Sequence, residues 1–337
     1  MLARVEGEGA LELSIRQGRI DDLKLRIFEP PRLFEKFLEG RGYHEVPDMV
    51  ARICGICPVA YQMSAVHAIE SVFGADAGPW VRDMRRLFYC GEWIQSHSLH
   101  IHLLAAPDFL GFENAIAMAR EHADVLRRGL GLQALGNDII RLLGGRSVHP
   151  VGARVGGFWQ APALDDLAEM YARLSAALPE AEALVRWTGA LNLPADDQSF
   201  TSVSLRHAHE YPFNAGRITA SNGLDIAVEE FERHFVEHQV PYSTALHALL
   251  DGMPYLVGPL ARINLNIDRL PTAVRGVLAE TGFPGIIAFI YSGYGFAAQS
   301  WFSHEHSAYS PSGPPIYHYK TIIPVTGVLL LLQGIVE

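Results

Sequence analysis

The stretch RLFEKFLEGRGYHEVPDMVARICGICP, residues 32–58, carries two of the three cysteines of the chain, Cys54 and Cys57. Two thiols at Cys-x-x-Cys spacing can form a redox disulfide, provide half of a metal site, or do neither. Thiolates bind soft and borderline transition metals, and a turn with Gly55 between them lets both sulfurs face one ion. No thioredoxin-like βαβ pattern surrounds the pair, which disfavours the redox interpretation. Taken alone, such a pair is more often a structural zinc half-site or an incidental pair than a catalytic centre.

The residues directly after the cysteine pair have the spacing of a helix. Pro58 suits the first position of a helix, where its missing N–H costs nothing. Apolar residues recur at helical spacing from Val59 to Phe73, and Gly74 can end the run. A helix that begins here directs its positive dipole end at the thiolates, and Arg52 adds a positive charge beside them.

Further out, the chain is predicted to be mainly α (α+β). Apolar and polar residues alternate over residues 11–15 and 23–27, which predicts an antiparallel hairpin with its turn at Gln17-Gly18. Short strands and turns are expected over residues 201–223, and a loop rich in Gly and Pro over residues 141–162. Further helices are expected over residues 81–105, 114–132, 165–188 and 224–237.

Composition limits the class of protein. The 337 residues are 49% apolar and carry a net charge of −10, which argues against nucleic acid as the main partner. Three cysteines cannot build a disulfide framework, so a reducing compartment is favoured. The first residues do not have the pattern of a signal peptide, and no run reaches the ~20 apolar residues of a membrane span. A cytoplasmic protein without a membrane span is therefore expected.

The spacing upstream of the cysteines resembles the N-terminal signature of the large subunit of nickel–iron hydrogenases. In that signature, Arg-x-hydrophobic-Glu is followed by fifteen residues and then by x-Arg-x-Cys-Gly-x-Cys, which matches residues 32–57. The segment ALHALLDGMPYLVGPLARINLN, residues 245–266, is similar to the cytosolic, NAD(P)-linked or sulfhydrogenase-type branch. Supporting stretches occur in family order: RVEGEG (4–9), EWIQSHSLHIHLLAAPDFLG (92–111) and GGRSVHPVGARVGGF (144–158). The resemblance covers about residues 1–282, which predicts a hydrogenase large-subunit-like helical core with a small N-terminal β element.

The resemblance also implies roles for individual residues. Cys54 would be a terminal nickel ligand and Cys57 would bridge nickel and iron, while the iron carries small diatomic ligands. Glu35 corresponds to a carboxylate ligand of magnesium, a role that suits a hard oxygen donor. Glu6 corresponds to the acid that relays protons to and from the nickel thiolate.

Other polar residues have plainer interpretations. Arg52 and His149 are expected next to the metal ligands, with His149 as a structural hydrogen-bonding residue. Cys90 is expected to be a small core residue of an apolar helix. Three histidines are expected to be buried hydrogen-bonding residues rather than metal ligands: His97, His100 and His102.

The activity implied by the resemblance is the reversible oxidation of H2 to protons and electrons. Electrons would leave through a small iron–sulfur subunit. In this branch they would then reach NAD(P) through diaphorase-type subunits that carry flavin and iron–sulfur clusters. Maturation proteins are further implied partners.

Two features depart from the family pattern. Tyr61 stands where the family usually has a histidine, and no cysteine follows Cys90, although the family has a second pair in an Asp-Pro-Cys-x-x-Cys-x-x-His motif. Residues 283–337 also contain only three charged residues, Glu305, Lys320 and Glu337. We therefore expect a divergent tail over residues 283–337, out of register with the family through a frameshift or truncation.

Two other functions stay open on the sequence. One is a non-catalytic scaffold that docks partner subunits, as in the homologous quinone-reductase subunit of respiratory complex I, which lacks the metal cysteines. The other is a zinc-binding structural protein that uses Cys54 and Cys57 together with histidines.

Overall fold

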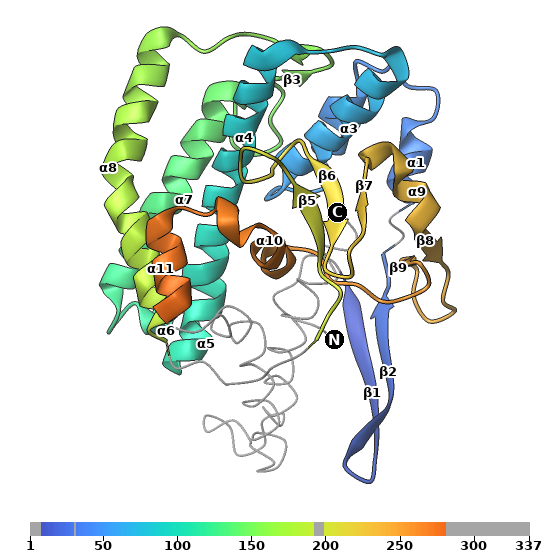
Figure 1. Cartoon of the computed structure of the whole chain (residues 1–337). Coiled ribbons are helices and arrows are strands. Elements are labelled where there is room, and N and C mark those ends of the chain that lie inside the picture. Colours follow the sequence, from blue (N-terminus) through green and yellow to red (C-terminus); the bar gives the residue numbers. More distant parts are fainter. Residues whose placement is uncertain (1–7, 30–31, 192–198, 281–337) are drawn as a thin grey trace. The chain divides into compact units, whose positions relative to one another are not determined.

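The computed structural model describes residues 8–29, 32–191 and 199–280 (Figure 1). These residues divide into two compact units. The helical unit comprises residues 32–184, and the β-rich unit comprises the described residues before 32 and after 184. The predicted boundary at residues 282 and 283, and the predicted tail, lie outside the described residues.

The helical unit is built from helices and one short strand pair. β3 (Ala153–Arg154) and β4 (Gly157–Phe158) form that pair, and η1 (His100–Ala105) is a π-helix. The α-helices are α1 (Leu33–Leu38), α2 (Val46–Val50), α3 (Pro58–Phe73), α4 (Gly78–Leu99), α5 (Ala106–Leu110), α6 (Ala115–Met118), α7 (Ala123–Gly144) and α8 (Leu164–Gly189), whose last residues belong to the β-rich unit.

Helix α3 confirms the prediction made from the sequence after the cysteines. It begins at Pro58, and Gly74 ends it in the left-handed conformation with φ 62°. A glycine has no Cβ to oppose this conformation, which makes it a common helix stop.

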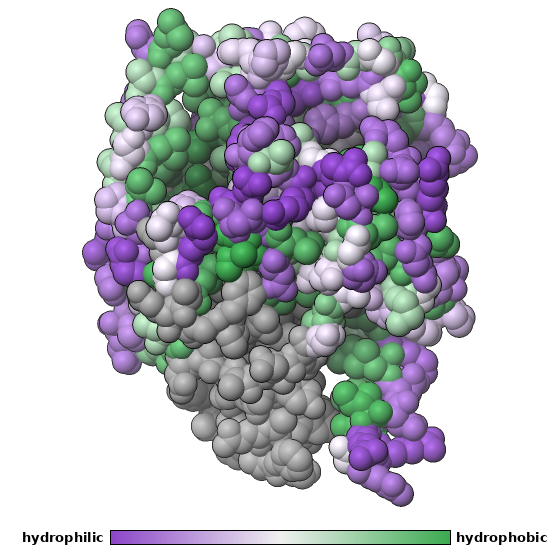
Figure 2. All heavy atoms as spheres, viewed as in Figure 1, coloured by the Kyte–Doolittle hydropathy of each residue, from purple (hydrophilic) through white to green (hydrophobic). Residues whose placement is uncertain are grey.

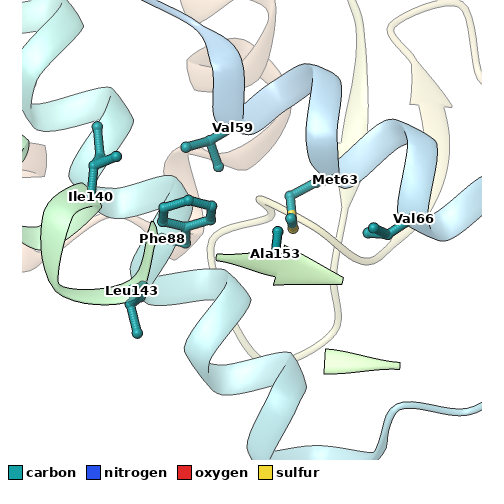
Figure 3. Packing of buried hydrophobic residues seen from close by; sticks show 7 residues of the cluster. All are labelled: Val59, Met63, Val66, Phe88, Ile140, Leu143 and Ala153. Carbon is teal, nitrogen blue, oxygen red and sulfur yellow. The ribbon is translucent and has the colours of Figure 1, made fainter. Parts of the chain in front are cut away.

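A buried apolar cluster packs α3 against α4 and α7. Phe88 of α4 lies between side chains of α3 and α7 (Figure 3). The members of the cluster are Val59, Met63, Val66, Phe88, Ile140, Leu143 and Ala153. Helices α4 and α7 approach closely because both carry glycine at the contact: a Cβ on Gly136 would lie 2.4 Å from the backbone nitrogen of Gln95. This packing fixes α4, which faces the start of α3.

The β-rich unit contains small antiparallel sheets. β1 (Gly9–Arg16) pairs with β2 (Arg19–Ile27), and β8 (Phe235–His238) pairs with β9 (His247–Leu250). A three-stranded sheet has the order β5 (Val203–Arg206), β6 (Arg217–Ala220), β7 (Asp225–Ile226). The helices of this unit are η2 (Val228–Glu230), α9 (Phe231–His234), α10 (Pro259–Asn266), η3 (Ile267–Arg269) and α11 (Thr272–Glu280).

The N-terminal hairpin confirms the predicted alternation. Leu13 pairs with Leu23 and Glu12 with Lys24, so one face is apolar and the other is charged. Figure 2 shows hydrophobic and hydrophilic residues side by side along this hairpin. Its turn at Gln17-Gly18 has positive φ at both residues, as tight hairpin turns require.

The helix expected over residues 224–237 was wrong. This segment holds only short helical turns before β8 begins at Phe235. Phe235 is buried, pairs with Leu250 and packs its ring against Tyr255 at 5.2 Å between centroids. This long-range pairing outweighs the local helical pattern.

Two other predicted helices had wrong bounds. The segment over residues 114–132 is split, because the Asn114 side chain caps the short α6 and the chain turns before α7 begins at Ala123. Helix α7 then continues into the predicted loop, since Leu143 is buried in the core. The helix expected over residues 81–105 begins at Gly78 and finishes as the π-helix η1.

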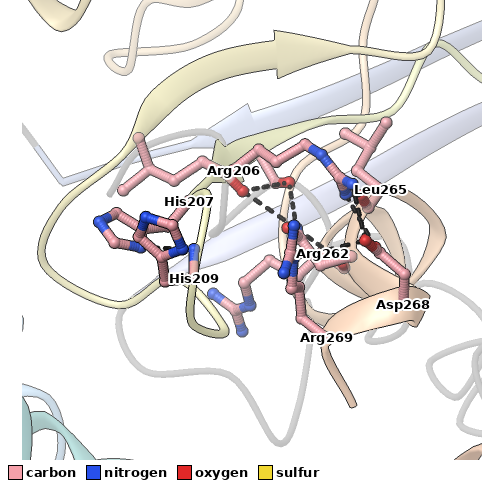
Figure 4. A network of polar contacts seen from close by, with 10 residues as sticks. Arg206, His207, His209, Arg262, Leu265, Asp268 and Arg269 are labelled. Carbon is pink, nitrogen blue, oxygen red and sulfur yellow. Dashed lines mark hydrogen bonds and ion pairs between the residues drawn. The ribbon is translucent and has the colours of Figure 1, made fainter.

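A polar network joins β5 to the helices that follow α10 in the β-rich unit. Arg206 donates to both carboxylate oxygens of Asp268 at 2.9 and 2.8 Å and to the carbonyl of Leu265 (Figure 4). Asn266 is fully buried beside it, and its Nδ2 lies 3.1 Å from Ser204 Oγ and 3.0 Å from the carbonyls of Leu205 and Arg262. Over the ranges that the structure covers, no helix combines the length and apolar character needed to cross a membrane.

Candidate metal centre

The cysteine turn, residues 54–57, leads directly into α3. Cys54 is 5% exposed and Cys57 is half-buried. The Sγ atom of Cys54 accepts hydrogen bonds from the backbone N–H groups of Ile56 at 3.3 Å and Cys57 at 3.1 Å. Backbone N–H groups directed at a sulfur favour its negatively charged form. The turn therefore presents Cys54 as a thiolate donor without any side-chain base.

Two buried polar side chains of α4 hold the backbone around the cysteine turn. Glu92 is 3% exposed and accepts hydrogen bonds from the backbone N–H groups of Val59 at 2.6 Å and Ala60 at 3.2 Å. Gln95 is 5% exposed, and its Nε2 donates to the carbonyl of Ile56 at 2.5 Å. The start of α3 is thus fixed by contacts from a helix more than thirty residues later in the chain.

The sequence interpretation missed Glu92 and Gln95, although the sequence contains a signal for them. Positions 81, 85, 88, 92 and 95 recur at helical core spacing, and all five are buried on α4. Polar residues at core positions of a helix need buried partners. Glu92 and Gln95 at that spacing therefore predict polar contacts to another segment, but not which segment.

His149 lies beside the cysteine turn. Its Nδ1 is 2.6 Å from the carbonyl oxygen of Ala51, and a Cβ placed on Gly55 would lie 3.9 Å from its Cε1. His149 adopts φ 48°, a left-handed conformation that is uncommon for a non-glycine residue. The hydrogen bond to Ala51 agrees with the structural role expected for His149. Arg52 is exposed at the surface.

The predicted magnesium ligand and proton relay are not brought to the cysteines. Glu35 lies on α1, is exposed, and pairs with Arg32, whose Nη1 is 3.0 and 2.9 Å from its two carboxylate oxygens. Glu6 lies outside the described residues. Among the residues that the structure describes, no three His, Cys, Asp or Glu side chains gather as a metal site would.

The histidines of α4 and η1 make backbone hydrogen bonds, as expected. His97 Nδ1 lies 2.8 Å from the carbonyl of Trp93, and the fully buried His102 places Nδ1 2.9 Å from the carbonyl of Ser98. Arg128 Nε donates to His102 Nε2 at 3.3 Å, which makes Nδ1 the protonated nitrogen of the neutral ring. Cys90 is half-buried, and burial raises the pKa of its thiol.

The arrangement of helices and small sheets is the fold of nickel–iron hydrogenase large subunits. A solved NAD+-reducing [NiFe]-hydrogenase in the H2-reduced state matches with a TM-score of 0.70 and 24% identity, over 99% of this chain and 75% of that chain. A [NiFeSe]-hydrogenase from Dm. baculatum matches with a TM-score of 0.65 and 21% identity, over 98% of this chain and 78% of that chain. Structures this distant in sequence establish the fold.

Sequence comparisons extend the match to the family. The family model for nickel-dependent hydrogenases matches residues 32–137. The alpha subunit of sulfhydrogenase 2 from Pyrococcus furiosus is 34% identical over 279 residues, which is 82% of this chain and 65% of the relative. The vhu F420-non-reducing hydrogenase of Methanocaldococcus jannaschii has a corresponding chain that is 28% identical, over 86% of this chain and 76% of the relative.

The chain belongs to the nickel-dependent hydrogenase family. It spans 65% and 63% of the lengths of the two Pyrococcus furiosus sulfhydrogenase alpha subunits that it matches, just under two thirds in each case.

The cysteine turn fits one half of a thiolate metal centre. Cys54 and Cys57 lie three residues apart at a tight turn that begins a helix, and Cys54 Sγ already accepts two backbone N–H groups. The third cysteine of the chain, Cys90, is in the middle of α4. The family's nickel–iron centre can therefore take two thiolates from the cysteine turn, and the described residues add no further cluster of ligands to them.

Proposed function

We propose that the chain acts as the catalytic large subunit of a nickel–iron hydrogenase that interconverts H2 with protons and electrons. The observation that carries this proposal is the preformed cysteine turn at the start of α3, in a chain of a nickel-dependent family. When bound, a nickel–iron centre supplies the site at which H2 is split. In this chain Cys54 would hold nickel, and Cys57 would bridge nickel and iron.

The roles of the surrounding residues are part of the same proposal. Glu6 would pass protons to and from the thiolates, and Glu35 would release Arg32 to hold a magnesium ion. His149 would keep the backbone before the cysteine turn in place through its hydrogen bond to Ala51, and Arg52 would add positive charge beside the thiolates.

The proposal extends to partners. A related solved structure is a NAD+-reducing hydrogenase, which supports electron transfer towards NAD(P). Electrons would leave through a small iron–sulfur subunit, pass through diaphorase-type flavin and iron–sulfur subunits, and reach NAD(P). Maturation proteins would insert the metals. The cytoplasm is the location that suits an NAD(P)-linked enzyme.

Metal analysis tests the proposal. The full chain would be produced with its small subunit in a host that carries nickel–iron maturation proteins, and nickel, iron and zinc would be measured together with H2-dependent dye reduction. We expect nickel and iron with activity, loss of both in Cys54→Ser and Cys57→Ser, and retention of both in the control Cys90→Ala. Zinc alone would instead support a structural zinc site, and a metal-free, inactive complex would support a non-catalytic scaffold.

The predicted division into residues 1–282 and 283–337 is tested on the gene. If the tail has lost register through a frameshift, one of the other two reading frames after codon 282 encodes Asp-Pro-Cys-x-x-Cys. A second cysteine pair in that frame would complete the set of four thiolates. Its absence from both frames would reject the frameshift.

A further inference from the structure

Helix α3 is capped by a side chain from another helix. Cys57 is its N-cap residue and makes no side-chain capping hydrogen bond, and Pro58 at the first helical position has no N–H. The next two N–H groups, of Val59 and Ala60, donate to Oε2 and Oε1 of Glu92 at 2.6 and 3.2 Å. These are the groups that a Ser, Thr, Asp or Asn at the N-cap normally satisfies.

This arrangement explains how a cysteine can occupy the N-cap position. Cysteine is not among the residues that cap helices well, so a helix that starts at Cys57 would leave two N–H groups without the usual acceptor. The Glu92 carboxyl group supplies both acceptors, and its 3% exposure shows that it is enclosed at this point rather than directed to solvent. The capping function has therefore moved from position 57 to position 92.

Gln95 adds a contact on the other side of Cys57. It lies three residues after Glu92 on the same buried face of α4, and donates to the carbonyl of Ile56 at 2.5 Å. One helix thus holds the backbone immediately before and immediately after Cys57. The side-chain direction of Cys57 follows from these backbone positions.

We propose that Glu92 is a positioning residue for Cys57: by capping α3 in place of the N-cap side chain, it allows a thiol at position 57 and fixes its direction. The capping requires no metal. Only the purpose of the fixed thiol, as a metal ligand, rests on the proposed hydrogenase function.

Amide hydrogen exchange at single-residue resolution on the full, metal-free chain tests the capping. In Glu92→Ala we expect exchange of the Val59 and Ala60 amides to rise by ~5-fold or more, which corresponds to the loss of a helix cap. Glu92→Gln keeps the shape and one acceptor oxygen, so an intermediate increase is expected. The control Ser98→Ala removes a buried hydrogen bond of the same helix to the carbonyl of Gly129, and exchange at Val59 and Ala60 should stay at the wild-type rate.

A rescue experiment separates capping from a general loss of structure. Serine at an N-cap can accept these hydrogen bonds itself, so Cys57→Ser in the Glu92→Ala background should restore slow exchange at Val59 and Ala60. Alkylation of Cys57 by iodoacetamide gives a second measurement: it should be several-fold faster in Glu92→Ala, with Cys90 in the same chain as reference.

The proposal is overturned if Glu92→Ala leaves exchange at Val59 and Ala60 unchanged, if Ser98→Ala raises it equally, or if Cys57→Ser gives no rescue. Should Glu92→Ala fail to fold, Glu92→Gln and the double variant decide between the same outcomes. Because exchange is measured without metal, an absence of nickel in the wild-type complex rejects the proposed function and leaves the capping result standing.

Discussion

Arg85 of α4 and Glu70 of α3 form a buried ion pair with two parallel hydrogen bonds. Nη1 and Nη2 of Arg85 lie 2.8 and 2.6 Å from the two carboxylate oxygens, and the side chains are 3% and 8% exposed. The backbone N–H of Gly156 donates to the same carboxylate at 2.7 Å. Burial raises the pKa of Glu70, but the hydrogen bonds from Arg85 and Gly156 and the charge of Arg85 outweigh it, so the pKa is lowered. The pair ties α3, α4 and the loop between β3 and β4 together.

Removal of one partner of this pair should be costly. Glu70→Ala leaves the Arg85 guanidinium buried without its counter-charge, and we expect the free energy of unfolding to fall by about 3–5 kcal/mol. Urea denaturation followed by circular dichroism measures the change. Glu39→Ala, which breaks the exposed pair with Lys36 at 2.5 Å, is the control and should cost about 1 kcal/mol or less. Equal losses in the two variants would contradict a special role for the buried pair.

His102 should make stability depend on pH. Burial lowers the pKa of His102, and the charge of Arg128 lowers it further, while the hydrogen bond to the Ser98 carbonyl opposes them. The unfolded chain therefore takes up this proton first as the pH falls. The contribution of neutral His102 is complete above the ordinary histidine pKa of about 6.5 and is lost as the pH falls from there towards the lower folded value.

The test is the slope of unfolding free energy between pH 7.5 and pH 5.5. We expect His102→Gln to reduce this slope, since glutamine does not titrate, and the exposed His44→Gln serves as control for the loss of a histidine. An unchanged slope in His102→Gln would show that His102 does not titrate differently on folding. Other buried histidines with lowered pKa values, His67 and His100, leave part of the slope in place.

Two glycines of α7 should respond in opposite directions to alanine. A Cβ on Gly136 would lie 2.4 Å from the backbone nitrogen of Gln95 and 2.6 Å from the carbonyl of Gly91, so Gly136→Ala must push α4 and α7 apart. We expect a loss of about 1–3 kcal/mol or more. Gly131, on the exposed side of the same helix, would have no atom within 4 Å of an added Cβ, and Gly131→Ala should stabilise by about 0.5–1 kcal/mol.

Thermal unfolding of both variants checks this pair. If Gly136→Ala stabilises as Gly131→Ala does, the close helix contact is not present in solution. The displacement of α4 should also raise amide exchange at Val59 and Ala60, because Glu92 lies on the displaced helix.

Asn266 should not tolerate aspartate. Its Nδ2 atom faces one hydroxyl oxygen and two carbonyl oxygens at 3.0–3.1 Å, and a carboxylate there would place acceptors against acceptors in a fully buried site. We expect Asn266→Asp to cost about 2–4 kcal/mol at neutral pH. The matched control is Asn264→Asp, because Asn264 is exposed and donates to the Ser202 hydroxyl at 3.2 Å, and a hydroxyl can turn to donate. Similar losses in both variants, measured by urea denaturation, would contradict this account.

Local patterns in the sequence predicted the elements that depend on neighbouring residues. The alternation of apolar residues predicted the hairpin of β1 and β2, and Pro58 and Gly74 marked the two ends of α3. The helix predicted over residues 224–237 failed because Phe235 is held by a partner, Leu250, fifteen residues away. No local pattern contains the energy of that pairing.

The sequence by itself determined the family and the two thiols, because the spacing of Arg32, Glu35, Cys54 and Cys57 is a property of the chain alone. The tertiary structure alone decided how the thiols are held. Glu92 and Gln95 are distant from Cys57 along the chain, and they reach its backbone only because the glycines of α4 and α7 let the helices pack closely and bury both side chains. Once buried, these polar groups must find hydrogen-bond partners, and the backbone at the start of α3 provides them.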